Sequence, residues 1–180
     1  MRETETRWVM VLDTRRCVGC SACVIGCKEE NDVPHGGFRD WVTTETRGGF
    51  PNLRTEHRSE RCNHCGIAPC VDNCPTGASY RGRSATVQID RIKCTGCKNC
   101  IAACPYGARF VDPRGFIDKC TFCAHLGGGT TSCAEICPTA CIVFGDAADP
   151  RSEVSRLLAT RPSKTLLPET GTDPQVYYLV

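Results

Sequence analysis

The sequence has no long hydrophobic run. No stretch approaches the roughly 18 consecutive apolar residues that a membrane-spanning helix needs. Residues 1–16 also lack the apolar core and the small-residue cleavage site of a secretory leader. Arg15 and Arg16 follow the short apolar run instead of preceding it, which is the wrong order for a twin-arginine leader. We therefore expect a chain without a membrane span or an export signal of its own.

An excess of charge of either sign is also missing. Lys and Arg total 22 against 20 Asp and Glu, so the formal net charge is only +2. No run of basic residues indicates a nucleic-acid groove. The GxGxxG, P-loop and HExxH motifs are absent, so no nucleotide or zinc-protease chemistry is indicated. We expect no nucleic-acid partner, no catalytic residue and no substrate site.

Conventional apolar residues are few. The hydrophobic fraction is 41% and includes 17 cysteines, whereas globular domains usually reach about 45 to 50%. A core this poor in Leu, Ile, Val and Phe needs another source of folding free energy, such as disulfides or bound metal. The cysteines are the residues that can supply it.

Sixteen of the 17 cysteines fall into four groups. Groups one and three share the spacing CxxCxxCxxxC, whereas group two has one loop that is two residues longer and group four has nine residues between its second and third cysteines. The groups are Cys17, Cys20, Cys23, Cys27; Cys62, Cys65, Cys70, Cys74; Cys94, Cys97, Cys100, Cys104; and Cys120, Cys123, Cys133, Cys137. Pro follows the last cysteine of groups two, three and four, and Cys141 is left over.

The flanks of the groups repeat as well. A short apolar segment ending in Asp precedes three of them, as VLD at 11–13, QID at 88–90 and FID at 116–118. CPTGASY at 74–80 is similar to CPYGARF at 104–110. Internal repetition is evidence independent of the cysteines. It predicts a unit of strand, cysteine loop and short helical turn that occurs four times.

The spacing favours iron–sulfur clusters. Three thiolates at CxxCxxC reach different irons of one cubane, and in two-cluster ferredoxins the fourth cysteine ligates the other cluster. Disulfides are typical of a cysteine content this high, but the close spacing, the odd total and the missing leader argue against them. Zinc sites use CxxC pairs roughly a dozen or more residues apart, which leaves the third and fourth cysteines of each group without a role. Covalent haem requires CxxCH, which is absent.

Two segments lie outside the cysteine groups. In the insertion at 28–61, the segments 38–46 and 53–60 flank a Gly- and Pro-containing turn and predict a two-stranded hairpin. We expect its aromatic residues to be core contacts, with a partner surface as the alternative. Downstream of Cys141, the residues at 152–160 predict a short amphipathic helix. An extended tail ending in VYYL follows, which we expect to lie along a surface of this chain or of a partner.

Three side chains near the cysteine loops invite a role toward a cluster. An imidazole N–H of His64 or His125 can donate a hydrogen bond to a cluster sulfur, but a solvated or backbone-bonded histidine is the commoner outcome. Cys141 has no vacant ligand position to fill, because each group already has four thiolates. We expect Cys141 to be a small buried residue.

The order of the motifs resembles that of the four-cluster iron–sulfur subunits of complex iron–sulfur molybdoenzymes. The motifs are CVGCSACVIGCKEEN, CNHCGIAPCVDNCPTGASY, CTGCKNCIAACPYGARF and CTFC followed by CAEICPTACIVFGD. The similarity is greatest to the polysulfide, tetrathionate, thiosulfate and dimethyl sulfoxide reductase types, and it spans nearly the whole chain. One departure is Cys141, at a place where many members have another residue.

The resemblance implies an α+β fold of two interleaved ferredoxin-like modules, with a β-hairpin insertion and an extended C-terminal tail. One module comprises residues 1–27 and 111–148 and the other residues 62–110; the insertion is 28–61, and a C-terminal helix and partner-binding tail occupy 149–180. The resemblance also implies four [4Fe-4S] clusters. In the expected order along the electron path, their ligands are Cys17, Cys20, Cys23, Cys137; Cys27, Cys120, Cys123, Cys133; Cys74, Cys94, Cys97, Cys100; and Cys62, Cys65, Cys70, Cys104.

The function that the resemblance implies is electron transfer without catalysis. The chain would relay single electrons between a molybdopterin-containing catalytic subunit and an integral-membrane, quinone-binding anchor subunit. It would associate with the membrane peripherally through that anchor, on the periplasmic face by co-export with the catalytic subunit or on the cytoplasmic face. The alternatives are a free polyferredoxin and a relay subunit of a hydrogenase or formate dehydrogenase. The hairpin insertion and the long tail favour a fixed partner.

Overall fold

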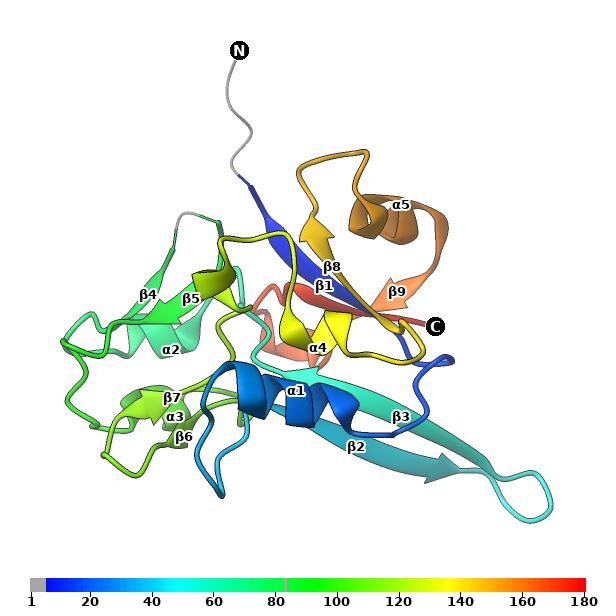
Figure 1. The fold of residues 1–180 in the computed structure, drawn as a ribbon, viewed down its shortest axis with the longest axis horizontal. Coiled ribbons are helices and arrows are strands. Elements are labelled where there is room, and N and C mark those ends of the chain that lie inside the picture. Colours follow the sequence, from blue (N-terminus) through cyan, green and yellow to red (C-terminus); the bar gives the residue numbers. More distant parts are fainter. Residues whose placement is uncertain (1–5, 83) are drawn as a thin grey trace.

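The computed structural model describes residues 6–82 and 84–180, so the first five residues of the segment searched for a leader lie outside it. The fold is α+β, as predicted (Figure 1). The strands are β1 (Trp8–Asp13), β2 (Asp40–Arg47), β3 (Arg54–Arg61), β4 (Ser79–Arg81), β5 (Val87–Ile89), β6 (Phe110–Val111), β7 (Ile117–Asp118), β8 (Ile142–Asp146), β9 (Ser163–Lys164) and β10 (Val176–Leu179). The helices are α1 (Ala22–Glu30), α2 (Pro69–Asp72), α3 (Asn99–Ala102), α4 (Ser132–Glu135) and α5 (Glu153–Thr160), with short 3₁₀ turns at Ala124–Leu126 and Pro168–Thr170. None of the helices in the described part of the chain has the length and apolar character needed to span a bilayer.

One four-stranded sheet forms the largest core, in the order β8-β1-β10-β9. Strand β1 lies between β8, which is antiparallel to it, and β10, which is parallel. Successive side chains of a strand point to opposite faces. Val9 and Val11 therefore pack with Val154 of α5 on one face, while Met10 and Leu12 face the cysteine-containing core on the other. Because both faces are covered, β1 reads as a continuous apolar run. We call this sheet with α1, α4 and α5 the sheet region.

The end of the C-terminal tail lies inside this sheet. The sequence left open whether the tail lies along this chain or along a partner, and Val176 and Tyr178 of β10 are fully buried within their own chain. The Tyr178 hydroxyl donates a hydrogen bond to the carbonyl of Ser59 at 3.2 Å. The tail lies here because the backbone N–H and C=O groups on the second edge of β1 need partners once they are buried.

Residues 62–118 form a second region, which we call the ribbon region. Its strands make only two-stranded ribbons, β4 with β5 and β6 with β7. Short helices α2 and α3 lie beside them (Figure 1). The β6–β7 ribbon pairs Val111 with Ile117 and so crosses the module boundary expected at residues 110 and 111. A turn at 112–115 joins these two-residue strands, which are too short to show a periodic pattern.

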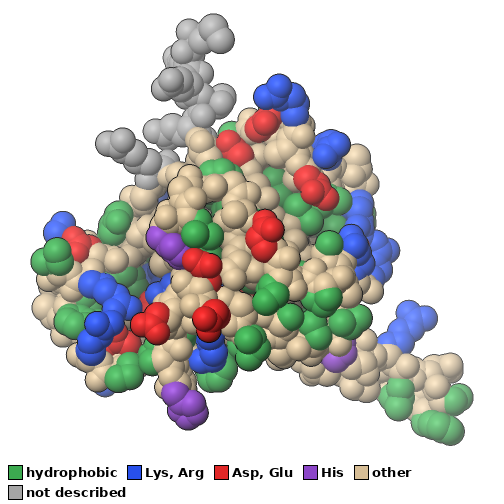
Figure 2. Space-filling view, in the orientation of Figure 1, with side chains coloured by type: hydrophobic (Ala, Val, Ile, Leu, Met, Phe, Trp, Pro, Cys, Tyr) green, Lys and Arg blue, Asp and Glu red, His purple; other side chains and the backbone are tan. Residues whose placement is uncertain are grey.

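The insertion contains the antiparallel pair β2–β3, which projects from the body of the molecule (Figure 1). Half-buried Trp41 packs against the core at the base of this hairpin. Phe50, at the tip, is 92% exposed, and Leu53 beside it is also exposed, so the tip carries apolar side chains in solvent (Figure 2). Phe50 is therefore not a core contact. Phe38 is half-exposed beneath the ammonium of Lys28, which lies 4.3 Å from the ring centre.

Candidate metal centres

The cysteines of groups one and three are presented by the same local backbone. Gly19 and Gly96 have φ values of 69° and 68°, and Ser21 and Lys98, two residues further on, have φ values of 59° and 65°. A Cβ at Gly19 would lie 2.7 Å from the His57 ring, so only glycine fits there. In all four groups the third cysteine lies on the short helix that follows the loop and is buried. The repeated unit predicted from the sequence is thus present four times.

The structure brings the sixteen cysteines together in four sets. Each set combines three cysteines of one group with one cysteine of another. We name the sets site A (Cys17, Cys20, Cys23, Cys137), site B (Cys27, Cys120, Cys123, Cys133), site C (Cys62, Cys65, Cys70, Cys104) and site D (Cys74, Cys94, Cys97, Cys100). They contain the same residues as the ligand sets that the resemblance implied, and their role as cluster ligands stays a prediction.

Sites A, B and D each surround a hollow in the protein. The cysteine side chains line these hollows together with a few neighbouring residues. The four cysteines of site C lie close enough together for the charges of the other three to affect Cys65. Burial, followed by the neighbouring Cys62, Cys70 and Cys104, raises the pKa of Cys65 to about 12, although a hydrogen bond from Thr172 opposes the rise.

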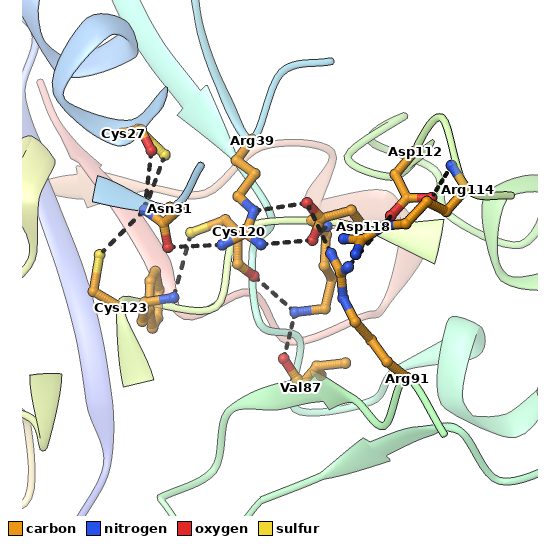
Figure 3. Close-up of polar contacts among 12 residues, drawn as sticks. Cys27, Asn31, Arg39, Val87, Arg91, Asp112, Arg114, Asp118, Cys120 and Cys123 are labelled. Atoms are coloured by element: carbon orange, nitrogen blue, oxygen red, sulfur yellow. Dashed lines mark hydrogen bonds and ion pairs between the residues drawn. The ribbon is translucent and has the colours of Figure 1, made fainter. Parts of the chain in front are cut away.

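Site B depends on the close approach of α1 and α4. A Cβ at Gly26 would lie 2.9 Å from the Ile136 side chain, and the Ser132 hydroxyl donates to the Gly26 carbonyl at 2.9 Å. This contact holds Cys27 of α1 beside Cys133 of α4. The Asn31 amide lies 3.8 Å from the sulfur of Cys27 and 3.9 Å from that of Cys123, between these two loops (Figure 3).

Ion pairs fix the end of β7 beside site B. Arg39 makes two hydrogen bonds to the carboxylate of Asp118, at 3.0 and 2.8 Å, and a third to the Asn31 side chain at 2.7 Å (Figure 3). Arg91 bridges Asp118 and Asp112 at 3.6 and 3.3 Å. A planar guanidinium that binds both carboxylate oxygens is geometrically specific. The network therefore positions the chain immediately before Cys120.

The order of the sites differs from the order we expected, in which site D came before site C. Burial, then Cys27 and Cys133 of site B and finally Cys62 of site C raise the pKa of Cys120, so Cys62 lies close to site B. Cys62 directly follows β3, whose last residue, Arg61, donates to Cys133 of site B at 2.9 Å. Chain continuity thus places site C next to site B. Since Arg61 lies close to cysteines of sites A and B, and Arg109 close to cysteines of sites C and D, the sites adjoin in the order A, B, C, D, which we call the row.

Burial shifts the pKa of several cysteine thiols upward. It raises the pKa of Cys23 to about 11 and that of Cys27 to about 12. Cys74 and Cys137 are exceptions, because hydrogen bonds to their sulfurs outweigh burial. The backbone N–H of Ser79 and the Thr76 hydroxyl lower the pKa of Cys74. Thr139 and Cys141 lower the pKa of Cys137 in the same way. Iron ligation requires thiolates. Sets of four thiols, most of them buried or half-buried, with N–H and O–H donors near sulfur fit [4Fe-4S] clusters.

Three buried cations beside the sites were not recognised from the sequence. Arg61 is close to cysteines of sites A and B, Lys119 to cysteines of sites B and C, and Arg109 to cysteines of sites C and D. In the sequence each looks like an ordinary surface charge. The only available signal was adjacency, since Arg61 and Lys119 directly precede Cys62 and Cys120.

The two histidines do not hydrogen-bond a cysteine sulfur. His64 is fully buried, stacks on Phe122 with ring centres 3.8 Å apart, and accepts a hydrogen bond from the backbone N–H of Val87 at 3.1 Å. Burial and the nearby Lys119 and Arg109 lower the pKa of His64, so it is neutral. His125 lies at the surface, 2.8 Å from Glu30.

Cys141 is buried, as predicted, at the edge of site A. Its sulfur lies 3.5 Å from that of Cys137, and its backbone N–H donates to the Cys137 sulfur at 3.4 Å.

Comparisons with known proteins agree with this chemistry. A family described as a 4Fe-4S dicluster domain matches residues 53–147, and a second family with the same description matches residues 16–78. Two dicluster domains correspond to the four [4Fe-4S] clusters that the cysteine groups predicted.

Curated relatives match over nearly the whole chain. Protein NrfC of Escherichia coli (strain K12) is 42% identical over 95% of this chain and 79% of its own length. A tetrathionate reductase subunit of Salmonella typhimurium is 38% identical over 96% of this chain and 72% of its own. The thiosulfate reductase electron transfer subunit PhsB of Salmonella typhi is 41% identical over 87% of this chain and 83% of its own. The chain therefore belongs to the 4Fe-4S dicluster family of iron–sulfur proteins.

Proposed function

We propose that this chain is the electron-transfer subunit of a membrane-associated oxidoreductase complex, built as two interleaved ferredoxin-like modules whose sites A to D hold one [4Fe-4S] cluster each. The observation that carries the proposal is the arrangement of four four-cysteine sets in one row through a small domain. A row of one-electron centres suits a relay better than a substrate site.

The exposure of the cysteines supports passage from one end of the row to the other. When bound, each cluster accepts and releases one electron at a time. Cys20 of site A and Cys97 of site D are exposed, whereas every cysteine of site B is buried and site C has only one that is half-buried. The two terminal sites thus reach the surface, and the protein excludes water from the two between them.

We propose a molybdopterin catalytic subunit as the partner at site A and a membrane anchor that reacts with quinone as the partner at site D. Relatives named as subunits of tetrathionate and thiosulfate reductases support a catalytic partner. The exposed apolar tip of the β2–β3 hairpin offers a contact surface, since isolated apolar side chains at a projecting tip gain free energy when a partner covers them. Association with the membrane would then be peripheral, through the anchor.

Affinity purification of the tagged chain from native membranes tests the proposal. We expect a large molybdenum-containing subunit and a hydrophobic subunit to copurify, and quinol to reduce the clusters only in the preparation that contains the hydrophobic subunit. Recovery of the chain alone, with full iron, would contradict the fixed relay and favour a free polyferredoxin. Recovery with a hydrogenase or formate dehydrogenase would replace the molybdenum reductase partner.

A further inference from the structure

Two buried arginines hold equivalent positions in the two halves of the row. Arg61 donates to the sulfur of Cys133 in site B at 2.9 Å, and Arg109 donates to the sulfur of Cys70 in site C at 2.8 Å. Each receives support from a serine hydroxyl, Ser59 for Arg61 and Ser79 for Arg109. Cys133 and Cys70 are both the third cysteine of their group. Both arginines are 5% exposed or less.

The two arginines differ in their counter-charge. Asp40, which faces Arg61 across the β2–β3 pair, is 2% exposed and lies 3.2 Å from its guanidinium. Ser59 also donates to Asp40 at 2.9 Å, so the carboxylate is held in place. Among the residues that the structure describes, no Asp or Glu forms an ion pair with Arg109, whose guanidinium donates to the Cys70 sulfur and to the Ser79 hydroxyl.

This difference bears on how easily each site accepts an electron. Reduction adds one negative charge, which a nearby cation stabilises and a nearby carboxylate opposes. Net charge, hydrogen bonds to sulfur and solvent exposure together set the potential of such clusters. Asp40 opposes the charge of Arg61 beside site B, whereas no carboxylate among the described residues is paired with Arg109 beside site C.

Resting on the cluster assignment made under the proposed function, we propose that Arg109 raises the reduction potential of the cluster at site C above that of the cluster at site B, where Asp40 neutralises Arg61. Arg109 and Asp40 act on the clusters through their charges and are not cluster ligands. Both sites have further donors near sulfur, the Asn31 amide at site B and the Thr172 hydroxyl at site C. Each site has one arginine hydrogen bond to the equivalent cysteine, seven of the eight cysteines are buried, and Lys119 is shared because it lies close to both Cys62 and Cys120.

The test is an EPR-monitored redox titration of the full chain with its clusters bound. The variants Cys65→Ser and Cys27→Ser assign the signals of sites C and B. We then expect Arg109→Gln to lower the midpoint of the site C signal, and Arg109→Lys, which keeps the charge, to recover most of that shift. Asp40→Asn should raise the midpoint of the site B signal. Arg114→Gln, an exposed arginine of the ribbon region, should move neither.

An unchanged site C midpoint in Arg109→Gln, at full iron content, overturns the proposal, and so does an unchanged site B midpoint in Asp40→Asn. If Arg109→Gln loses iron from site C, Asp40→Asn decides: a raised site B midpoint supports the proposal and an unchanged one overturns it. A failure of the proposed function is read separately, from the iron content and the copurifying subunits of the unaltered chain.

Discussion

The sheet region and the ribbon region hold the same cysteine chemistry in different surroundings. On one face of the sheet region lies a core without cysteine, formed by Val9, Val11, Val154 and Leu179. In the main core cluster of the ribbon region three of the six buried residues are themselves cysteines, namely Cys65, Cys70 and Cys100. Its strands are three residues long or shorter. The sheet region can therefore retain structure without metal, whereas the ribbon region depends on what its cysteines bind.

Removal of iron should separate the two regions most clearly. After chelation under reducing conditions, we expect rapid amide hydrogen exchange across residues 62–118 and continued protection in β1, β8 and β10, because only the sheet keeps an apolar core. The iron-loaded chain is the control. Simultaneous loss of protection in both regions would show that the sheet also depends on metal and would remove the distinction.

Single ligand substitutions sharpen the comparison. Cys70→Ser and Cys133→Ser should each lower the iron content below about sixteen per chain, and Cys70→Ser should lower the melting temperature more, because site C lies in the region with the smaller core. Cys141→Ser is the matched control, since Cys141 is equally buried but belongs to none of the four sets. A loss of iron in Cys141→Ser equal to that in Cys133→Ser would make Cys141 a ligand.

A substitution in the apolar core tests the stability of the sheet region. Val154→Ala removes two methyl groups from a fully buried position against the sheet, which should cost about 2 kcal/mol of the free energy of unfolding of the sheet region. Denaturant titration followed by hydrogen exchange measures this for each region. Val111→Ala, at a partly exposed position in β6, is the control and should have little effect. An equal loss of protection in the ribbon region would mean that the two regions unfold as one unit.

The smallest expected effect is at a contact that joins the regions. The Tyr106 hydroxyl lies 2.6 Å from that of Thr172, in the segment that leads to β10. Tyr106→Phe should therefore lower stability by about 1 kcal/mol. Tyr80→Phe is the control, since the Tyr80 ring is partly exposed and its hydroxyl makes no hydrogen bond with the described residues. Equal losses in the two variants would show that the hydroxyl bond contributes nothing.

The sequence predicted the features that repeat or follow a period. The apolar segments before groups one, three and four are β1, β5 and β7, and the cysteine loops lead into short helices. Three features could not be predicted from the sequence. The parallel pairing of β10 with β1 joins segments more than 160 residues apart. The order of sites C and D depends on the path of the chain in three dimensions. Arg109 is recognisable as buried only when the site around it is known. Each is set by tertiary contacts and leaves no local pattern.

The most direct test of the account is the metal content of the chain purified without oxygen, measured together with its EPR spectrum after reduction by dithionite. Four cubanes predict about sixteen irons and an equal amount of acid-labile sulfide per chain, with a brown colour that bleaches on reduction. A colourless protein that contains zinc, or one whose cysteines are paired as disulfides, would contradict the assignment of sites A to D and everything inferred from it.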